Sequence, residues 1–131
     1  MKKYTAEDLK GFKRDRYGLL LCPAGDYTEI KSFPERCSFG ERCSFGEGCS
    51  FEGGHIAAPG YPLLTFSGFG SENRTTYAFN CQDGIWVRCG CFSGSLEEFR
   101  EKVRERHGNT ALALEYLAIA DLIERRFSGR E

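Results

Sequence analysis

The residues best suited to chemistry gather in a stretch between positions 67 and 88. They combine guanidinium groups, a carboxamide, a hydroxyl and an aromatic ring. These candidate ligand-binding residues are Ser71, Asn73, Arg74, Tyr77 and Arg88. Guanidinium groups pair with phosphate oxygens in a two-pronged geometry, and aromatic rings stack on nucleotide bases. We therefore predict that these residues bind a phosphorylated, nucleotide-type small molecule.

The same stretch also has a purely structural interpretation. Ser71 and Asn73 are typical turn residues, and Glu72 and Asp83 are acidic neighbours with which the arginines can pair. The two arginines share one surface only if the strands on either side of Asp83 pair in a suitable register. The sequence leaves both interpretations open.

The sequence does not show a catalytic set in which a nucleophile, a base and an orienting group come together. It has two histidines, His55 and His107. His107 lies at an expected helix end, where a positive charge is favourable. His55 comes directly after the six-residue repeats that are described below. In acyltransferases built from hexapeptide repeats, a histidine of the repeat region acts as the catalytic base. An acyltransferase-like enzyme is therefore one alternative. We expect a protein that is not an enzyme and that uses no cofactor.

The seven cysteines do not form a zinc motif. Zinc sites are usually marked by close Cys-x2-Cys pairs, which this sequence lacks, and an odd number of cysteines cannot all form internal disulfides. Free cysteine is often a small buried residue, which is the interpretation we favour, so we expect no metal site. The spacing leaves open whether Cys89, Cys91 and His55 meet around a metal.

A six-residue repeat occupies the first half of the chain. An aromatic residue recurs with this period at Phe33, Phe39, Phe45 and Phe51, and the unit reads Phe-Gly-Glu-x-Cys-Ser. A fixed short period is typical of a solenoid, and this unit resembles the hexapeptide repeat of left-handed parallel β-helices. We expect the phenylalanine to fill the inside and the glycine after it to allow the tight turn. A glycine-rich linker, the alternative, rarely keeps an aromatic residue in strict phase.

The second half carries strand and helix signals. Apolar or alternating runs, which predict three antiparallel strands, lie at residues 63–66, 74–81 and 85–92. Asp83-Gly84 is typical of a hairpin turn between two of them. Ser95 and Glu98 have the spacing of a capping box, which predicts the start of a helix, and a second helix follows.

We therefore expect an α+β fold in a single domain. In this fold, a short hexapeptide-type parallel β-helix is continued by an antiparallel β-hairpin region and then by a C-terminal helical pair. The expected segments are an N-terminal helix and strand at 1–24, β-helical repeats at 25–56, antiparallel strands at 60–92 and two helices at 95–127.

The last helix is apolar around most of its circumference. The apolar residues are Leu112, Leu114, Tyr116, Leu117, Ile119, Leu122 and Ile123. Such a helix is either deeply buried or shared with another chain. Because a short chain offers little to bury it against, we expect a homo-oligomer that forms through this C-terminal helix.

Composition limits the range of partners. The 131 residues include 18 basic and 19 acidic side chains, for a net charge of −1, and this balance argues against nucleic-acid binding. The sequence has no apolar run of the roughly 20 residues needed to cross a membrane, and its N-terminus lacks the apolar core of a secretory signal. We expect a cytoplasmic protein with neither a nucleic-acid nor a membrane partner.

A series of short motifs runs from about Phe33 to Phe127. They are Cys-Ser-Phe-Glu-Gly-Gly-His, Gly-Tyr-Pro, Gly-Ser-Glu-Asn-Arg, Thr-Tyr-Ala-Phe, Asp-Gly-Ile-Trp-Val-Arg and Phe-Arg-Glu-Lys-Val. In this combination the chain resembles a family of small phage and prophage proteins of gut bacteria. Members of that family carry varying numbers of Cys-x-Phe-Gly repeats before a similar C-terminal part.

The resemblance brings no established activity, but its phage context implies a role against host defence. One class of small oligomeric phage proteins sequesters nucleotide immune signals in pockets between subunits. We therefore predict a non-enzymatic anti-defence protein in the host bacterial cytosol. Its oligomer pocket would hold a cyclic dinucleotide or a cyclic or conjugated ADP-ribose. The alternative is a protein-interaction module that inhibits a host defence protein.

Overall fold

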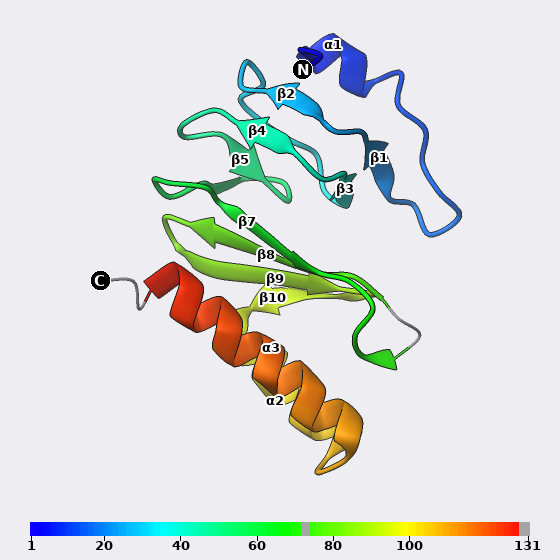
Figure 1. Cartoon of the computed structure of the whole chain (residues 1–131), viewed down its shortest axis with the longest axis vertical. Helices are drawn as coiled ribbons and strands as arrows, with labels where there is room; N and C mark the ends of the chain where they lie inside the picture. Colours follow the sequence, from blue (N-terminus) through cyan, green and yellow to red (C-terminus); the bar gives the residue numbers. More distant parts are fainter. Residues whose placement is uncertain (72–73, 129–131) are drawn as a thin grey trace. The chain divides into compact units, whose positions relative to one another are not determined.

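The computed structural model describes residues 1–71 and 74–128. The chain divides after Tyr61 into two compact units, which we call unit 1 and unit 2 (Figure 1). Unit 1 is built from small sheets of very short strands, whereas unit 2 combines an antiparallel sheet with two helices. The expected α+β class and the C-terminal helical pair are thereby confirmed.

Unit 1 begins with the single-turn helix α1 (Ala6–Leu9). Its strands are β1 (Leu20–Cys22), β2 (Gly25–Tyr27), β3 (Cys37–Phe39), β4 (Cys43–Phe45), β5 (Ser50–Phe51) and β6 (His55–Ile56). Strand β1 pairs in parallel with β3, β2 pairs in parallel with β4, and β5 pairs antiparallel with β6. The parallel partners lie about three repeat units apart in sequence, as in Gly25 opposite Cys43. These are separate two-stranded sheets, and the continuous β-helix stays a prediction.

The repeated aromatic residues form the core of unit 1. Phe33 and Phe51 are each 1% exposed, and their rings stack with centroids 5.4 Å apart. Tyr27, Phe39 and Phe45 pack around them, with centroid distances of 5.0 to 6.3 Å across the cluster. The cysteines of the repeat are buried as small residues. The prediction that the phenylalanines point inward is therefore confirmed.

The tight turns of the repeat fall at a different residue from the one expected. The residue before each repeat cysteine adopts a left-handed backbone, with φ of 62° at Arg36, 60° at Arg42 and 74° at Gly48. The glycine after the phenylalanine has another role. A side chain at Gly46 would collide with the backbone of Thr28 in the neighbouring segment. The glycine therefore permits a close approach between two segments rather than a turn.

Unit 2 contains one sheet and two helices. Its elements are β7 (Leu63–Phe66), β8 (Thr76–Cys81), β9 (Gly84–Cys89), β10 (Phe92–Ser95), α2 (Leu96–His107) and α3 (Ala111–Ser128). In the described part of the unit, the strands form an antiparallel sheet in the order β10-β9-β8-β7. The hairpin predicted at Asp83-Gly84 is confirmed, although its turn lies at residues 82 and 83, which join β8 to β9, and Gly84 is the first residue of β9.

The expectation of three strands is wrong, since the sheet has four strands in the residues described. The run that looked like one strand over residues 85–92 is broken at Gly90, which has a φ of 60°. The chain turns back at Gly90-Cys91, so that Phe92 pairs with Cys89. A left-handed backbone is cheap at glycine, and this single residue converts one long strand into a second hairpin.

Helices α2 and α3 pack on one face of this sheet (Figure 1). The capping box at the start of α2 is confirmed: the Glu98 amide donates to Ser95 Oγ at 3.1 Å, and the Ser95 amide donates to Glu98 Oε1 at 2.8 Å. The α3 face toward the sheet buries Tyr116 and Ile123, whereas Leu114 and Leu122 are 67% and 52% exposed. Within the described residues, we find no helix that combines the length and the apolar character needed to cross a membrane.

Candidate functional site

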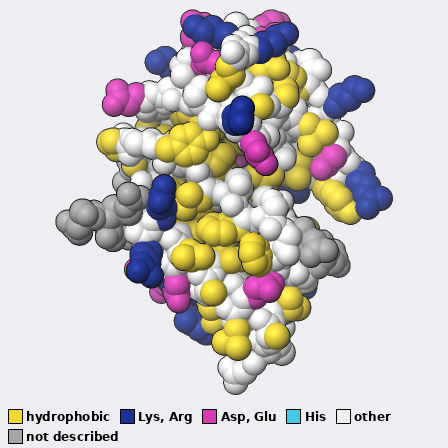
Figure 2. Space-filling view, viewed as in Figure 1, with side chains coloured by type: hydrophobic (Ala, Val, Ile, Leu, Met, Phe, Trp, Pro, Cys, Tyr) yellow, Lys and Arg dark blue, Asp and Glu magenta, His cyan; other side chains and the backbone are white. Residues whose placement is uncertain are grey.

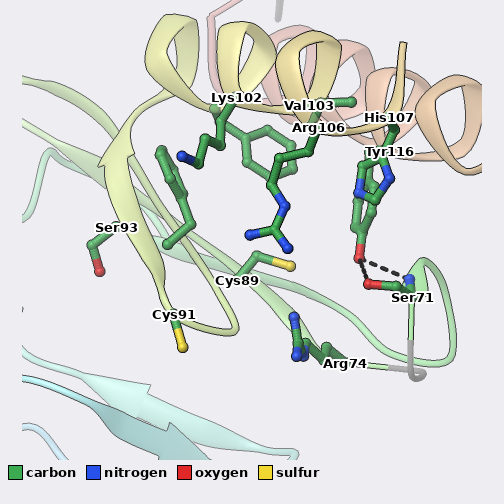
Figure 3. Close-up of a pocket in the computed structure, with 12 residues that line it drawn as sticks. Ser71, Arg74, Cys89, Cys91, Ser93, Lys102, Val103, Arg106, His107 and Tyr116 are labelled. Atoms are coloured by element: carbon green, nitrogen blue, oxygen red, sulfur yellow. Dashed lines mark hydrogen bonds between the residues drawn. The ribbon is translucent and has the colours of Figure 1, made fainter. Parts of the chain in front are cut away.

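Unit 2 contains a cavity of about 540 Å³ between helix α2 and the turn that joins β9 to β10 (Figure 3). Its lining comes from the loop before β8, the β9–β10 hairpin and both helices. The lining residues are Ser71, Arg74, Cys89, Cys91, Phe92, Ser93, Phe99, Lys102, Val103, Arg106, His107 and Tyr116. A volume of this size is typical of small-molecule sites.

Helix α2 supplies one wall of the cavity. Lys102 and Arg106 are four residues apart, so they lie one above the other on the same helix face. Figure 3 shows both side chains descending from α2 toward the hairpin. The neighbouring Val103 is 5% exposed and packs into the core, which anchors the helix on the sheet. The apolar contact of α2 thus determines where its two cationic side chains point.

The β9–β10 turn and Arg74 form the opposite wall. A side chain added at Gly90 would come within 2.8 Å of Arg74 Nη1, so the arginine lies directly against the turn. Cys89, just before the turn, is buried, and its sulfur accepts a hydrogen bond from Thr76 Oγ1 at 3.2 Å. Cys91, within the turn, is exposed. The glycine therefore both reverses the chain and makes room for the guanidinium.

A third wall is held together by helix α3. The Ser71 amide donates to Tyr116 Oη at 2.9 Å, and the hydroxyl groups of the same two residues lie 3.2 Å apart. The Gly70 amide donates to a carboxylate oxygen of Glu115. The Tyr116 ring stacks on the ring of His107, with centroids 5.6 Å apart. These contacts hold Gly70 and Ser71 at the edge of the cavity.

The lining is strongly cationic. Among the described residues that line the cavity, the charged side chains are Arg74, Lys102 and Arg106, and none is a carboxylate. Lys102 has a carboxylate partner outside the lining, Glu105, at 3.3 Å, but both side chains are exposed and such a pair is weak. Positive charge gathered in one concave site attracts anions. On the face shown in Figure 2, acidic and basic side chains are interspersed.

The structure brings only part of the predicted site together. Ser71 and Arg74 line the same cavity, and Asn73 lies outside the described residues. Tyr77 and Arg88 pair directly with each other on β8 and β9, and the Arg88 guanidinium lies 4.4 Å from the centre of the Tyr77 ring. Arg88 is 1% exposed.

The pleat of the sheet explains why the two arginines separate. Side chains alternate between the two faces along a strand. Val87 and Cys89 belong to the core that the helices cover, so Arg88 between them points to the other face. The structure therefore does not bring Arg88 or Tyr77 to the cavity, and their role in ligand binding stays a prediction.

The cavity also contains residues that the sequence did not single out as ligand contacts. They are Lys102, Arg106, His107, Tyr116 and Cys91. The four-residue spacing of Lys102 and Arg106 beside an apolar stripe was a visible signal that both lie at the edge of the buried helix face. The contribution of Tyr116 had no such signal, because it depends on contacts between residues far apart in sequence.

The described residues show no group of three or more histidine, cysteine, aspartate or glutamate side chains that could hold a metal ion. Cys89 and Cys91 belong to unit 2, and His55 belongs to unit 1.

Comparison with known proteins adds no family to this description. No protein-family model matches the chain, and the searches of curated proteins and of solved structures find no match. The resemblance to phage and prophage proteins stays a prediction, and function has to be inferred from the geometry of the chain.

Proposed function

We propose that this protein binds a phosphorylated, nucleotide-type ligand in the unit 2 cavity and leaves it chemically unchanged. The observation that supports this proposal is the lining of the cavity, which combines the cationic side chains of Arg74, Lys102 and Arg106 with aromatic rings. Phosphate groups are bound by arginine and lysine side chains, and bases by aromatic surfaces.

The lining suggests a division of roles. The guanidinium groups of Arg74 and Arg106 and the ammonium group of Lys102 bind phosphate oxygens. The half-buried ring of Phe92 and the stacked pair of His107 and Tyr116 provide surfaces for a base. The Ser71 hydroxyl, already close to Tyr116, is a hydrogen-bonding group at the rim.

In the phage context that the family resemblance implies, such binding would sequester a nucleotide immune signal. The two classes of signal we consider are cyclic dinucleotides and cyclic or conjugated ADP-ribose. This biological role rests on the resemblance, whereas the phosphate-binding property rests on the cavity. The two parts of the proposal can therefore be tested one after the other.

Isothermal titration calorimetry with members of both ligand classes tests the binding. We expect the wild-type protein to bind at least one of them, and Arg74→Ala or Arg106→Ala to weaken that binding by at least about tenfold. Arg125→Ala is the matched control, because Arg125 is an exposed arginine of α3 outside the cavity. Wild-type protein that binds no member of either class, or equal losses in all three variants, would contradict the proposal. Recovery of the ligand unchanged after incubation checks that no reaction occurs.

A second candidate function is protein–protein interaction through α3. Leu114 and Leu122 are exposed and lie eight residues apart, on one helix face with Ala118 between them. The same face supports the proposed homo-oligomer, because exposed leucines in a row are costly in a monomer. Light scattering coupled to size exclusion measures the subunit number. Leu114→Glu together with Leu122→Glu should convert an oligomer to a monomer. If the wild-type protein is already a monomer, the homo-oligomer is wrong and the partner of this face is a different protein.

We also propose that the repeats of unit 1 form a short β-helix of the hexapeptide type. Parallel partners about three repeats apart and the aromatic cluster support this proposal. Inserting three repeats after Gly46 should add one turn and keep the protein folded. Inserting a single repeat at the same place should move every later segment to the next side of the coil, so that it no longer lies beside its strand partner. The midpoint temperature of unfolding should then fall. Equal effects of the two insertions would contradict a three-sided coil.

A further inference from the structure

We infer that a hairpin of unit 1, at residues 13–21, binds single-stranded nucleic acid. In this inference, arginines at the tip of the hairpin hold phosphate groups of the strand, and the ring of Tyr17 stacks on one of its bases. The site belongs to unit 1, so it is separate from the cavity of unit 2 and from the function proposed for that cavity.

Backbone hydrogen bonds give the hairpin a defined shape. The Leu21 amide donates to the Lys13 carbonyl at 2.9 Å, which closes the base of the hairpin. Its carboxylate, Asp15, shapes the turn, because Asp15 Oδ1 accepts from the Tyr17 and Leu19 amides at 2.8 and 3.0 Å. Figure 1 shows the chain between α1 and β1 running out from the strands of unit 1 and back. The tip of the hairpin can therefore reach a large partner.

Three guanidinium groups gather at this tip. Arg14 Nη1 donates to the Gly18 carbonyl oxygen at 2.7 Å. Arg36 comes from a later segment of the chain, and its Nη2 atom donates to the Tyr17 carbonyl oxygen at 3.1 Å. Arg16 Nη2 donates to Tyr17 Oη at 2.9 Å, and its guanidinium lies 5.0 Å from the centre of the ring. Because Tyr17 and Gly18 are adjacent, the three cations surround a single turn.

The acceptors of these hydrogen bonds are uncharged, so they leave the positive charge of the arginines in place. In the part of the chain that the structure describes, none of the three guanidinium groups forms an ion pair with a carboxylate. A guanidinium has five N–H donors, so each arginine keeps donors for an incoming anion. Phosphate oxygens match this geometry and relieve the repulsion between the three cations.

Tyr17 adds an aromatic surface to this cluster. It is 64% exposed, and Arg16 lies over its ring. An exposed aromatic ring beside arginines is typical of surfaces that bind single strands, since unpaired bases stack on the ring while the cations hold the backbone. An acidic peptide offers carboxylates to the arginines but no base to the ring. The combination therefore favours a single strand of nucleic acid.

The total charge of the chain, from which we expect no nucleic-acid partner, does not describe this hairpin. Residues 13–21 contain the cations Lys13, Arg14 and Arg16 and the single carboxylate Asp15. The fold then adds Arg36 to the tip. Positive charge is thus concentrated locally, although the chain as a whole is nearly neutral.

Fluorescence anisotropy with a labelled oligothymidylate of about twelve nucleotides tests the inference on the full chain. We expect binding that weakens between about 20 and 150 mM NaCl, with a slope of log affinity against log salt of roughly −2 to −3 for three to four phosphate contacts. Tyr17→Ala should weaken this binding at least about fivefold. The same variant should leave the binding of a duplex unchanged, because paired bases are not free to stack on the ring.

Arg36 and Arg42 provide a matched pair of variants. Both precede a repeat cysteine, with φ of 62° and 60°, but the Arg36 side chain bonds to the hairpin. Arg36→Gln should weaken binding about five- to tenfold and make the salt slope shallower by about 0.7. Arg42→Gln should change neither quantity. Thermal unfolding checks that both variants are folded, and Arg36→Lys, which keeps the charge, should retain most of the slope.

Three outcomes would overturn the inference. The first is that the wild-type protein does not bind the oligothymidylate at about 20 mM salt. The second is that it binds polyglutamate equally well, in which case the hairpin attracts any polyanion and an acidic protein becomes the better partner. The third is that Arg42→Gln and Arg36→Gln weaken binding equally, because the attraction then comes from the charge of unit 1 as a whole.

Discussion

The phenol oxygen of Tyr116 lies 2.9 Å from the amide nitrogen of Ser71, and this contact joins helix α3 to the loop before β8. The two residues are 45 positions apart in sequence. Tyr116 is 4% exposed, and its ring also stacks on His107. One buried side chain therefore holds both the loop wall of the cavity and the end of helix α2.

Replacing Tyr116 with phenylalanine should loosen this loop without removing the ring. The Ser71 amide then loses its partner, so we expect a loss of about 1–2 kcal/mol in the free energy of unfolding. Ligand affinity should also fall, because Ser71 and Arg74 belong to the same wall. Urea denaturation and hydrogen exchange at Gly70 and Ser71 measure these effects.

Tyr61→Phe is the matched control for this substitution. Tyr61 donates a hydrogen bond to the Cys43 carbonyl at 2.8 Å within unit 1. Because Tyr61 is 57% exposed, the loss of this bond should lower stability by less than about 1 kcal/mol and leave the cavity unchanged. If both variants affect ligand binding alike, the effect of Tyr116→Phe is one of general stability and not of the loop contact.

The aromatic cluster of unit 1 should dominate the stability of that unit. Phe33 is 1% exposed and packs against the rings of Tyr27, Phe39 and Phe51. Because Phe33→Ala leaves a cavity among these rings, we expect it to cost about 3–5 kcal/mol of unfolding free energy. Phe69→Ala, at a position that is 45% exposed, should change stability by less than about 0.5 kcal/mol. Chemical denaturation measures the free energy of unfolding of both variants. Equal losses in the two variants would show that the aromatic cluster is not the core of unit 1.

Cys91 should be the thiol that reacts with a maleimide in the native protein. It is exposed in the β9–β10 turn, whereas the other six cysteines are buried. Mass spectrometry of the native protein should find one label, and Cys91→Ser should remove it. Because Cys91 lines the cavity, a bound nucleotide should slow the labelling. Labelling at an unchanged rate under saturating ligand would place the ligand outside this cavity.

Unit 1 should lose stability in alkaline solution. The hydrogen bond with Cys37, together with burial, raises the pKa of the Cys22 thiol well above its usual value of 9.0. Burial also raises the pKa of the Tyr27 phenol above 10.0. In the unfolded chain both groups ionise at their usual pKa values. The folded state is therefore fully stabilised by the two protonated groups below about pH 9, and this stabilisation decreases as the pH rises further.

Thermal unfolding measured by circular dichroism between about pH 7 and pH 11 checks this dependence. We expect the midpoint temperature of unfolding to fall between about pH 9 and pH 11. Cys22→Ala combined with Tyr27→Phe should flatten the curve, even though both changes also shift its starting value. A wild-type midpoint that stays constant up to pH 11 would show that these groups ionise as easily in the folded protein as in the unfolded chain.

Much of this protein follows from local patterns in the sequence. The six-residue period predicts the buried phenylalanines of unit 1, because a residue at the same position of every repeat can pack against its equivalents in the neighbouring repeats. The Asp83-Gly84 turn and the capping box of Ser95 and Glu98 are equally local, because each depends on a few adjacent residues. The break at Gly90 was missed, since a lone glycine inside an alternating run does not distinguish a turn from a strand.

The site was decided by tertiary structure. Arg74 and Arg88 look equivalent in the sequence, but the pairing of Tyr77 with Arg88 and the alternation of the pleat place Arg88 on the face opposite the helices. Lys102 reaches the cavity because α2 buries Val103 against the sheet. Which charged groups meet therefore depends on strand register and helix packing, which arise from contacts between residues far apart in the chain and leave little trace in any short stretch of sequence.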